Sequence, residues 1–250
     1  MHCFGGRFMS IQSNQAAGTA APAFQIGMLI FDGMTALDFA APLDVFARMP
    51  GARVHILSKT SNPVKTDLGF LEVPTMAMAE APKLDLLFIG GGPGVNALME
   101  DDEVLHFFAS RAAEARWVTS VCTGALVLGA AGLLRGYKAT THWAAMEVLP
   151  VLGAEPVVER VVIDRNRITA GGVTAGLDFG LVVTAQMHGD GLAQAMQLAM
   201  EYDPHPAFDV GSPRTAPAAL VAEVRERLRP ATQARLAAAT RVAKKNGWHA

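Results

Sequence analysis

Short apolar runs alternate along the chain with segments in which apolar residues recur at helical spacing. Runs of four to eight apolar or β-branched residues are typical of strands buried on both faces of a parallel sheet. The sequence predicts such strands over residues 24–31, 54–57, 84–89 and 117–121. Helical spacing predicts helices over residues 34–48, 103–116, 124–131 and 173–188. This alternation favours parallel pairing through crossover connections.

Two further segments predict antiparallel pairs. Residues 64–74 suggest a small hairpin with residues 67–69 at its turn, and residues 161–163 pair with residues 167–170 across a short turn. No internal repeat is present. We therefore predict the α/β fold class, in the form of a single doubly wound sandwich.

The chain divides into a tail, a body and an arm. Residues 1–23 contain only short apolar pieces, which predicts a disordered N-terminal tail. The α/β body is predicted over residues 24–217 and ends in a proline-rich connector, and residues 218–250 are predicted to form a helical arm. The apolar residues that recur at helical spacing on this arm are Leu220, Val221, Val224 and Leu228. This stripe favours packing on the body or on a partner subunit.

Composition disfavours several classes of protein. The 21 Lys and Arg residues nearly balance the 23 Asp and Glu residues, so the chain lacks the basic field that nucleic-acid binding uses. The most apolar long segment, residues 118–134, is interrupted by Thr, Ser and Gly, which argues against a membrane span. Residues 1–23 lack the apolar core of a secretory signal, and two cysteines in 250 residues fit a reducing cytosol. We expect a cytoplasmic protein with no nucleic-acid or membrane partner.

Candidate chemistry begins at Cys122, at the junction between a predicted strand and a predicted helix. In a doubly wound sheet, ligands bind beyond the carboxyl ends of the strands, and a sharp strand-to-helix turn points its central side chain outward. The first N–H groups of the following helix stabilise a thiolate, so we expect this thiol to be more acidic than free cysteine. From the residues alone, the alternative is a small packed side chain.

Two other loops are expected at the same edge of the sheet. Residues 90–94, with the sequence GGGPG, allow backbone N–H groups to approach a ligand closely, although such a run also serves as an ordinary turn. This run matches neither GxGxxG nor GxxxxGK[ST], so no nucleotide site is predicted. Asp38 follows the first strand amid apolar neighbours and is either a proton-transfer group or a helix cap.

His142 lies 20 residues after Cys122. It is either a base for the thiol or a surface or capping residue. The other histidines show no metal-ligand spacing, and neither HxxxH nor CxxC occurs. We predict no metal site.

Taken together, these motifs resemble the DJ-1/PfpI superfamily. The segments that carry the resemblance are the loop around Asp38, the GGGPG run, SVCTGALVLGAAGLL, ATTHW and AGGVTAGLDFGL, and it covers residues 24–217. The resemblance implies a flavodoxin-like sandwich of the DJ-1/PfpI (class I glutamine amidotransferase-like) type, with an elbow cysteine near an acid from the first loop. Within the superfamily, the segments around Cys122 and the later segment EYDPHPAFDVGSPRTAP are most similar to the isonitrile hydratases.

This resemblance implies hydration of a small-molecule isonitrile, R–N≡C, to an N-substituted formamide by a homodimer without a cofactor. Cys122 would attack the isonitrile carbon to form a thioimidate, and Asp38 would move the protons. Thr123 would orient the site, and its N–H together with that of Gly92 would hold the developing charge. His142 is not required in this mechanism.

Three other functions compete with this interpretation. A cofactor-independent glyoxalase acting on small aldehydes would use the same cysteine and acid, and a thiol-based sensor would use an oxidisable Cys122. Some AraC-class transcription regulators carry a similar domain ahead of a helix-turn-helix module. About 33 residues follow Pro217 and the net charge is only -2, which disfavours that third function.

Overall fold

A seven-stranded sheet forms the centre of the computed structural model, which describes residues 24–248. The predicted tail over residues 1–23 lies outside the described residues. The strand order is β10-β11-β7-β6-β1-β2-β5, and every neighbouring pair is parallel except β10 and β11. The strands of this sheet are β1 (Phe24–Leu29), β2 (Ala52–Ser58), β5 (Met76–Ala77), β6 (Leu86–Ile89), β7 (Trp117–Val121), β10 (Val161–Asp164) and β11 (Arg167–Ala170).

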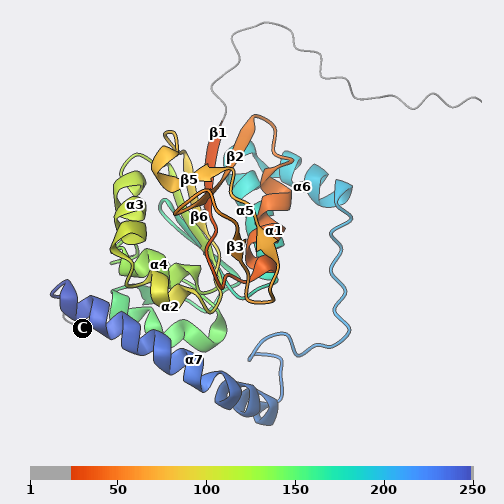
Figure 1. Ribbon diagram of the computed structural model, residues 1–250. Helices are drawn as coiled ribbons and strands as arrows, with labels where there is room; N and C mark the ends of the chain where they lie inside the picture. Colours follow the sequence, from red (N-terminus) through yellow and green to blue (C-terminus); the bar gives the residue numbers. More distant parts are fainter. Residues whose placement is uncertain (1–23, 249–250) are drawn as a thin grey trace, which may run out of the picture.

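Helices cover both faces of the sheet (Figure 1). On one side lie α1 (Ala36–Phe46), α5 (Ala175–His188) and α6 (Asp190–Ala199). On the other lie α2 (Val95–Leu98), α3 (Asp102–Ala112) and α4 (Gly124–Ala130). The short remaining elements are β3 (Val64–Lys65), β4 (Leu71–Glu72), η1 (Met78–Glu80), β8 (Lys138–Ala139), η2 (Trp143–Val148), η3 (Pro150–Leu152) and β9 (Glu155–Pro156). The doubly wound α/β sandwich is confirmed, as are both predicted antiparallel pairs, β3–β4 and β10–β11.

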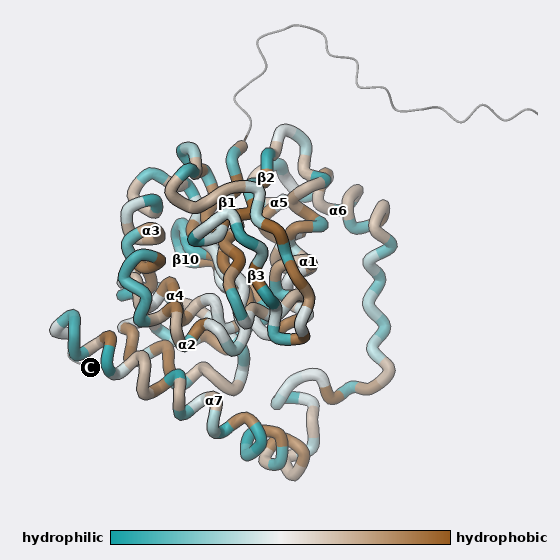
Figure 2. Tube along the Cα trace, in the orientation of Figure 1, coloured by the Kyte–Doolittle hydropathy of each residue, from teal (hydrophilic) through white to brown (hydrophobic). Residues whose placement is uncertain are grey.

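The hydrophobic core lies on both faces of the sheet, and on one face its aromatic side chains gather where α1 and α5 pack. Phe46, Phe88 and Phe179 form a cluster with ring centroids 5.6 to 6.4 Å apart, and all three are fully buried. The two helices approach closely because Gly180 on α5 has no side chain. A Cβ at this position would lie only 2.8 Å from a side-chain atom of Val45 on α1. Figure 2 shows hydrophobic residues along β1 and α1, whereas much of α3 on the outside is hydrophilic.

The connections from β1 and from β6 diverge on opposite sides of the sheet. The chain passes from β1 through α1 to β2 on one side, and from β6 to β7 on the other. In doubly wound sheets the crevice at such a switch point is the usual ligand site. The loop that follows β1 leads into Asp38, and the GGGPG run follows β6, so both lie at this crevice. Cys122 follows β7, the next strand along.

Helix α7 (Ala218–Lys245) packs on the body through its second half. The buried residues of this helix are Thr232, Ala238, Ala239, Val242 and Ala243. Most of the contact with the body is thus made beyond the stripe from Leu220 to Leu228, and packing of that stripe on a partner subunit stays a prediction. Leu220 is 38% exposed, and Val221 and Val224 line a small cavity against Trp143 and the connector.

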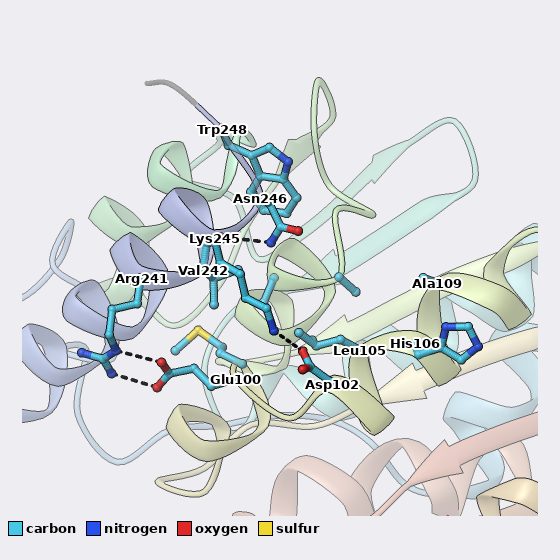
Figure 3. Close-up of a pocket in the computed structure, with 13 residues that line it drawn as sticks. Glu100, Asp102, Leu105, His106, Ala109, Arg241, Val242, Lys245, Asn246 and Trp248 are labelled. Atoms are coloured by element: carbon cyan, nitrogen blue, oxygen red, sulfur yellow. Dashed lines mark hydrogen bonds and ion pairs between the residues drawn. The ribbon is translucent and has the colours of Figure 1, made fainter.

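Near its C-terminal end, α7 is tied to the start of α3. Arg241 pairs with Glu100 through two contacts of 2.8 Å, and Lys245 pairs with Asp102 at 2.5 Å (Figure 3). These side chains surround a cavity of about 480 Å³ that contains none of the predicted site residues. Such exposed pairs contribute little stability, so the buried alanines and Val242 hold the helix in place. No helix among residues 24–248 is long and apolar enough to cross a membrane.

Candidate active site

Cys122 lies on a tight turn between β7 and α4. Its φ of 55° falls in the left-handed region, which is uncommon for a residue with a side chain. Its N–H donates to the carbonyls of Ala170 at 3.0 Å and Gly171 at 2.8 Å, and Thr141 Oγ1 donates to its carbonyl at 2.8 Å. These bonds hold a backbone conformation that costs about 1 to 3 kcal/mol. The sharp strand-to-helix turn that the sequence predicts at Cys122 is confirmed.

Asp38 lies in the first turn of α1 and is fully buried. Thr35 occupies the N-cap position, so the helix-cap alternative for Asp38 is wrong. The carboxyl instead reaches across the site, where Oδ2 accepts a hydrogen bond from the N–H of Gly91 at 2.9 Å. The thiol of Cys122 also faces this carboxyl. Its other oxygen, Oδ1, is buried without a well-aligned partner among residues 24–248.

The glycine loop fits between Asp38 and Thr123 because it has no side chains. A Cβ at Gly91 would lie 2.5 Å from Thr123 N, 2.6 Å from Thr123 Oγ1 and 2.8 Å from Asp38 Oδ2. The next residue, Gly92, has a φ of 139°, and its N–H donates to Thr123 Oγ1 at 3.1 Å. In this geometry Gly92 orients the Thr123 hydroxyl. That the Gly92 N–H stabilises negative charge on a substrate stays a prediction. It requires this N–H to leave Thr123 Oγ1 and donate to the substrate instead.

Packing at the start of α4 also depends on glycine. A Cβ at Gly124 would lie 2.4 Å from the carbonyl oxygen of Ile89, the last residue of β6. Since real Cβ atoms do not approach backbone this closely, only glycine brings α4 against the end of β6. This contact places the elbow cysteine beside the glycine loop.

Asp38 and Cys122 lie in hydrogen-bond contact and affect each other's pKa. Burial raises the pKa of Asp38 to about 6, although the hydrogen bond from the Cys122 thiol partly lowers it. Burial and the charge of Asp38 raise the pKa of the Cys122 thiol, whereas the Thr123 N–H and Arg235 lower it. The expectation of an acidic resting thiol is therefore wrong, because dehydration outweighs the field of α4, a helix of seven residues. At neutral pH the carboxyl is ionised and the sulfur carries the proton.

His142 caps η2 in this structure. Its Nδ1 accepts a hydrogen bond from the N–H of Ala144 at 3.3 Å, and its ring packs against Gly172, where a Cβ would lie 2.8 Å from His142 Cδ2. Burial and the charge of Arg235 lower the pKa of this histidine. The ring is therefore neutral at neutral pH, and of the two interpretations the structure favours the capping role.

Arg235 is a residue of this region that sequence reasoning missed. It lies on α7, and its charge acts on both Cys122 and His142. Its Nε atom is buried and has no hydrogen-bond partner among the described residues. No sequence signal distinguishes it, since the same helix carries several other arginines.

The site combines a thiol, a buried carboxyl and backbone N–H groups. Cys122, Asp38, Thr123 and Gly92, the predicted site residues, all lie together. A thiol beside a carboxylate with a pKa of about 6 can add to an electrophilic carbon and return its proton near neutral pH. Among residues 24–248, no group of three or more His, Cys, Asp or Glu side chains is arranged to hold a metal.

Known proteins share this arrangement of elements. The chain is 49% identical to the isonitrile hydratase of Pseudomonas putida over 223 residues, which is 89% of this chain and 98% of that enzyme. It is 31% identical to the HTH-type transcriptional regulator GbdR of Pseudomonas aeruginosa over 71% of this chain but 50% of the regulator.

A solved structure and a family model agree with these matches. The crystal structure of a ThiJ/PfpI family protein from Pseudomonas syringae superposes with a TM-score of 0.84 at 42% identity, covering 93% of this chain and 97% of that one. The model of the DJ-1/PfpI family matches residues 25–186, which include the β1 loop, the glycine loop and the elbow. The chain therefore belongs to the DJ-1/PfpI family.

Proposed function

We propose that this protein is an isonitrile hydratase, a lyase that adds water to R–N≡C and yields an N-substituted formamide. The observation that carries this proposal is the 49% identity to the Pseudomonas putida isonitrile hydratase over nearly the whole of both chains. The buried pair of Asp38 and Cys122 supports it, because the reaction needs a nucleophile and a group that moves protons. The match to GbdR covers half of that regulator and supports the shared fold.

In the first step, Cys122 Sγ bonds to the terminal carbon of the isonitrile. Asp38 accepts the thiol proton and delivers it to that same carbon, so the product is a neutral thioimidate, Cys122–S–CH=N–R. A carboxyl with a pKa of about 6 suits both halves of this transfer near neutral pH. One S–H bond breaks, and one S–C and one C–H bond form.

In the second step, water attacks the thioimidate carbon. Asp38 takes one proton from the water, and the other passes from the new hydroxyl to the nitrogen. The C=O double bond forms as the S–C bond breaks, which releases R–NH–CHO. The sulfur leaves as a thiolate and recovers the proton held by Asp38. We expect the N–H of Thr123 to stabilise the departing sulfur and Gly92 to fix the Thr123 hydroxyl beside it.

The test is formamide production from a small panel of aryl and alkyl isonitriles by wild type, Cys122→Ala and Asp38→Asn. We expect activity in wild type, none in Cys122→Ala, and a loss of about 100-fold or more in Asp38→Asn. Intact-protein mass spectrometry would detect the thioimidate as an added mass equal to the isonitrile. Absence of formamide from folded wild type would refute the proposal, and methylglyoxal turnover or peroxide oxidation of Cys122 would then identify the competing function.

We also infer a homodimer that works in the cytoplasm, where a reduced thiol persists. Residues 200–217 run outside the body between α6 and α7 (Figure 1). In this connector Phe208 is 75% exposed and Val210 is 41% exposed. A second copy of the chain would cover these apolar side chains. Sedimentation at micromolar concentration should give a dimer that Phe208→Ser weakens, whereas a monomeric wild type would contradict the inference.

A further inference from the structure

Helix α7 is physically connected to the elbow. In Figure 1 the chain enters β1 at the top, and α7 crosses the opposite end of the molecule. On α7, Thr232 Oγ1 donates to the carbonyl of Ala144 in η2 at 2.9 Å. The residue Thr141, two positions before η2, donates to the carbonyl of Cys122 at 2.8 Å. One short path of hydrogen-bonded residues therefore joins α7 to the elbow.

Arg235 is three residues beyond Thr232, so both side chains share one face of α7, the face directed at η2. The Nε of Arg235 is buried without a partner among residues 24–248. A buried, unpaired N–H of a charged group is costly, which makes this position unfavourable for folding alone. A guanidinium in such a position is available to an acceptor or a negative charge in the site.

The charged and titratable groups around Arg235 come from three elements. Cys122 on the elbow and His142 at the start of η2 both sense its charge, and Asp38 on α1 faces Cys122. The groove between η2 and α7, a cavity of about 610 Å³, adds Glu147 from η2 and three charged side chains from α7. These three are the exposed Arg225, Glu226 and Arg229, and the last two form an ion pair.

We propose that Arg235 is a positioning residue of the Cys122 site, whose guanidinium stabilises the sulfur when it becomes negatively charged. The positive charge offsets the adverse effects of burial and of Asp38 on a thiolate, and it acts whenever the S–C bond forms or breaks. The C-terminal helix is thereby part of the active centre. The inference rests on the proposed function for its role in turnover, but its effect on the thiol needs no isonitrile.

The test measures alkylation of Cys122 by iodoacetamide against pH in the full-length protein, with peptide mass spectrometry separating Cys122 from Cys3. Wild type is compared with Arg235→Met, Arg235→Gln and Arg235→Lys, and Arg229→Met serves as a control that removes an exposed arginine of the same helix. We expect Met and Gln to slow alkylation about tenfold at pH 8 and to move the pH profile up by about one unit. Lysine should restore most of the rate, and Arg229→Met should match wild type.

A second reagent separates charge from packing. Iodoacetate is anionic, so its rate relative to iodoacetamide should fall several-fold when the Arg235 charge is removed. An unchanged pH profile and an unchanged reagent ratio in Arg235→Gln would overturn the proposal, as would a lysine variant that behaves like glutamine. If the methionine variant does not fold, the Gln and Lys variants still decide the question. The alkylation test is independent of turnover: the expected change in thiol reactivity would support this inference even if wild type hydrates no isonitrile, whereas unchanged thiol reactivity would overturn it even if formamide is formed.

Discussion

Replacing Asp38 by asparagine should stabilise the protein while it abolishes proton transfer. The carboxyl is fully buried in the folded protein. Burial disfavours its ionised form and raises its pKa from 3.8 to about 6. Asparagine has nearly the same shape and still offers an oxygen to the N–H of Gly91, a bond of 2.9 Å in this structure. The substitution therefore removes the charge and keeps the contact.

The sign and size of the effect follow from the raised pKa. A raised carboxyl pKa favours folding below pH 3.8 and loses that contribution as pH rises through about 6. The full difference corresponds to about 3 kcal/mol at neutral pH, at about 1.4 kcal/mol for each pH unit between the two values. The free energy of unfolding of Asp38→Asn should exceed that of wild type by about 1 kcal/mol at pH 4.5 and about 3 kcal/mol at pH 7.

Urea unfolding at pH 4.5 and pH 7 checks this prediction. The control is Asp209→Asn, which makes the same chemical change at an exposed position and should show no such pH-dependent gain. A difference between Asp38→Asn and wild type that does not grow between the two pH values would refute the reasoning. A stabilised but inactive Asp38→Asn variant would show that keeping the Asp38 carboxylate ionised in the buried site lowers the free energy of unfolding.

Other predictions follow from the same contacts. Because Asp38 must be ionised to accept the thiol proton, kcat/KM for isonitrile hydration should fall about tenfold per pH unit below about pH 6; a flat profile from pH 5 to 7 would contradict this. Gly91→Ala should lower activity at least 100-fold and destabilise the fold by about 1 to 3 kcal/mol, because its Cβ would lie 2.5 Å from Thr123 N, whereas Gly191→Ala, with open space around it, should change neither for the worse. Thr141→Val removes the 2.8 Å bond to the elbow carbonyl and should cost about 1 to 3 kcal/mol in thermal or urea unfolding, with Thr141→Ser close to wild type.

Local sequence signals were sufficient for most of the sheet and for the elbow. Strand β6 is buried at all four positions, which is the condition that a continuous apolar run indicates. The sequence identifies Cys122 because a strand and a helix leave only Cys122 and Thr123 between them for a sharp turn. Helix α6 (Asp190–Ala199) was not predicted, because Gly189, with a φ of 85°, interrupts the pattern directly after α5.

Properties that depend on distant contacts were not readable from the sequence. The sequence suggested an acidic Cys122 thiol from its position before a helix, but the thiol's burial and the Asp38 carboxylate reverse the direction. The apolar stripe on the arm was visible, yet the side of α7 that packs on the body is made mostly of small residues such as Ala238 and Ala239. Arg235 lies 113 positions after Cys122, and only folding brings its charge to the elbow.

The glycine loop also limits how substrate preference can diversify in proteins built like this one. Any side chain at Gly91 or Gly124 would collide with Thr123 and Asp38 or with the backbone of the glycine loop, so neither position tolerates a larger residue. Variation in specificity must then come from residues outside these two positions. A library for altered substrate range should accordingly leave both glycines constant.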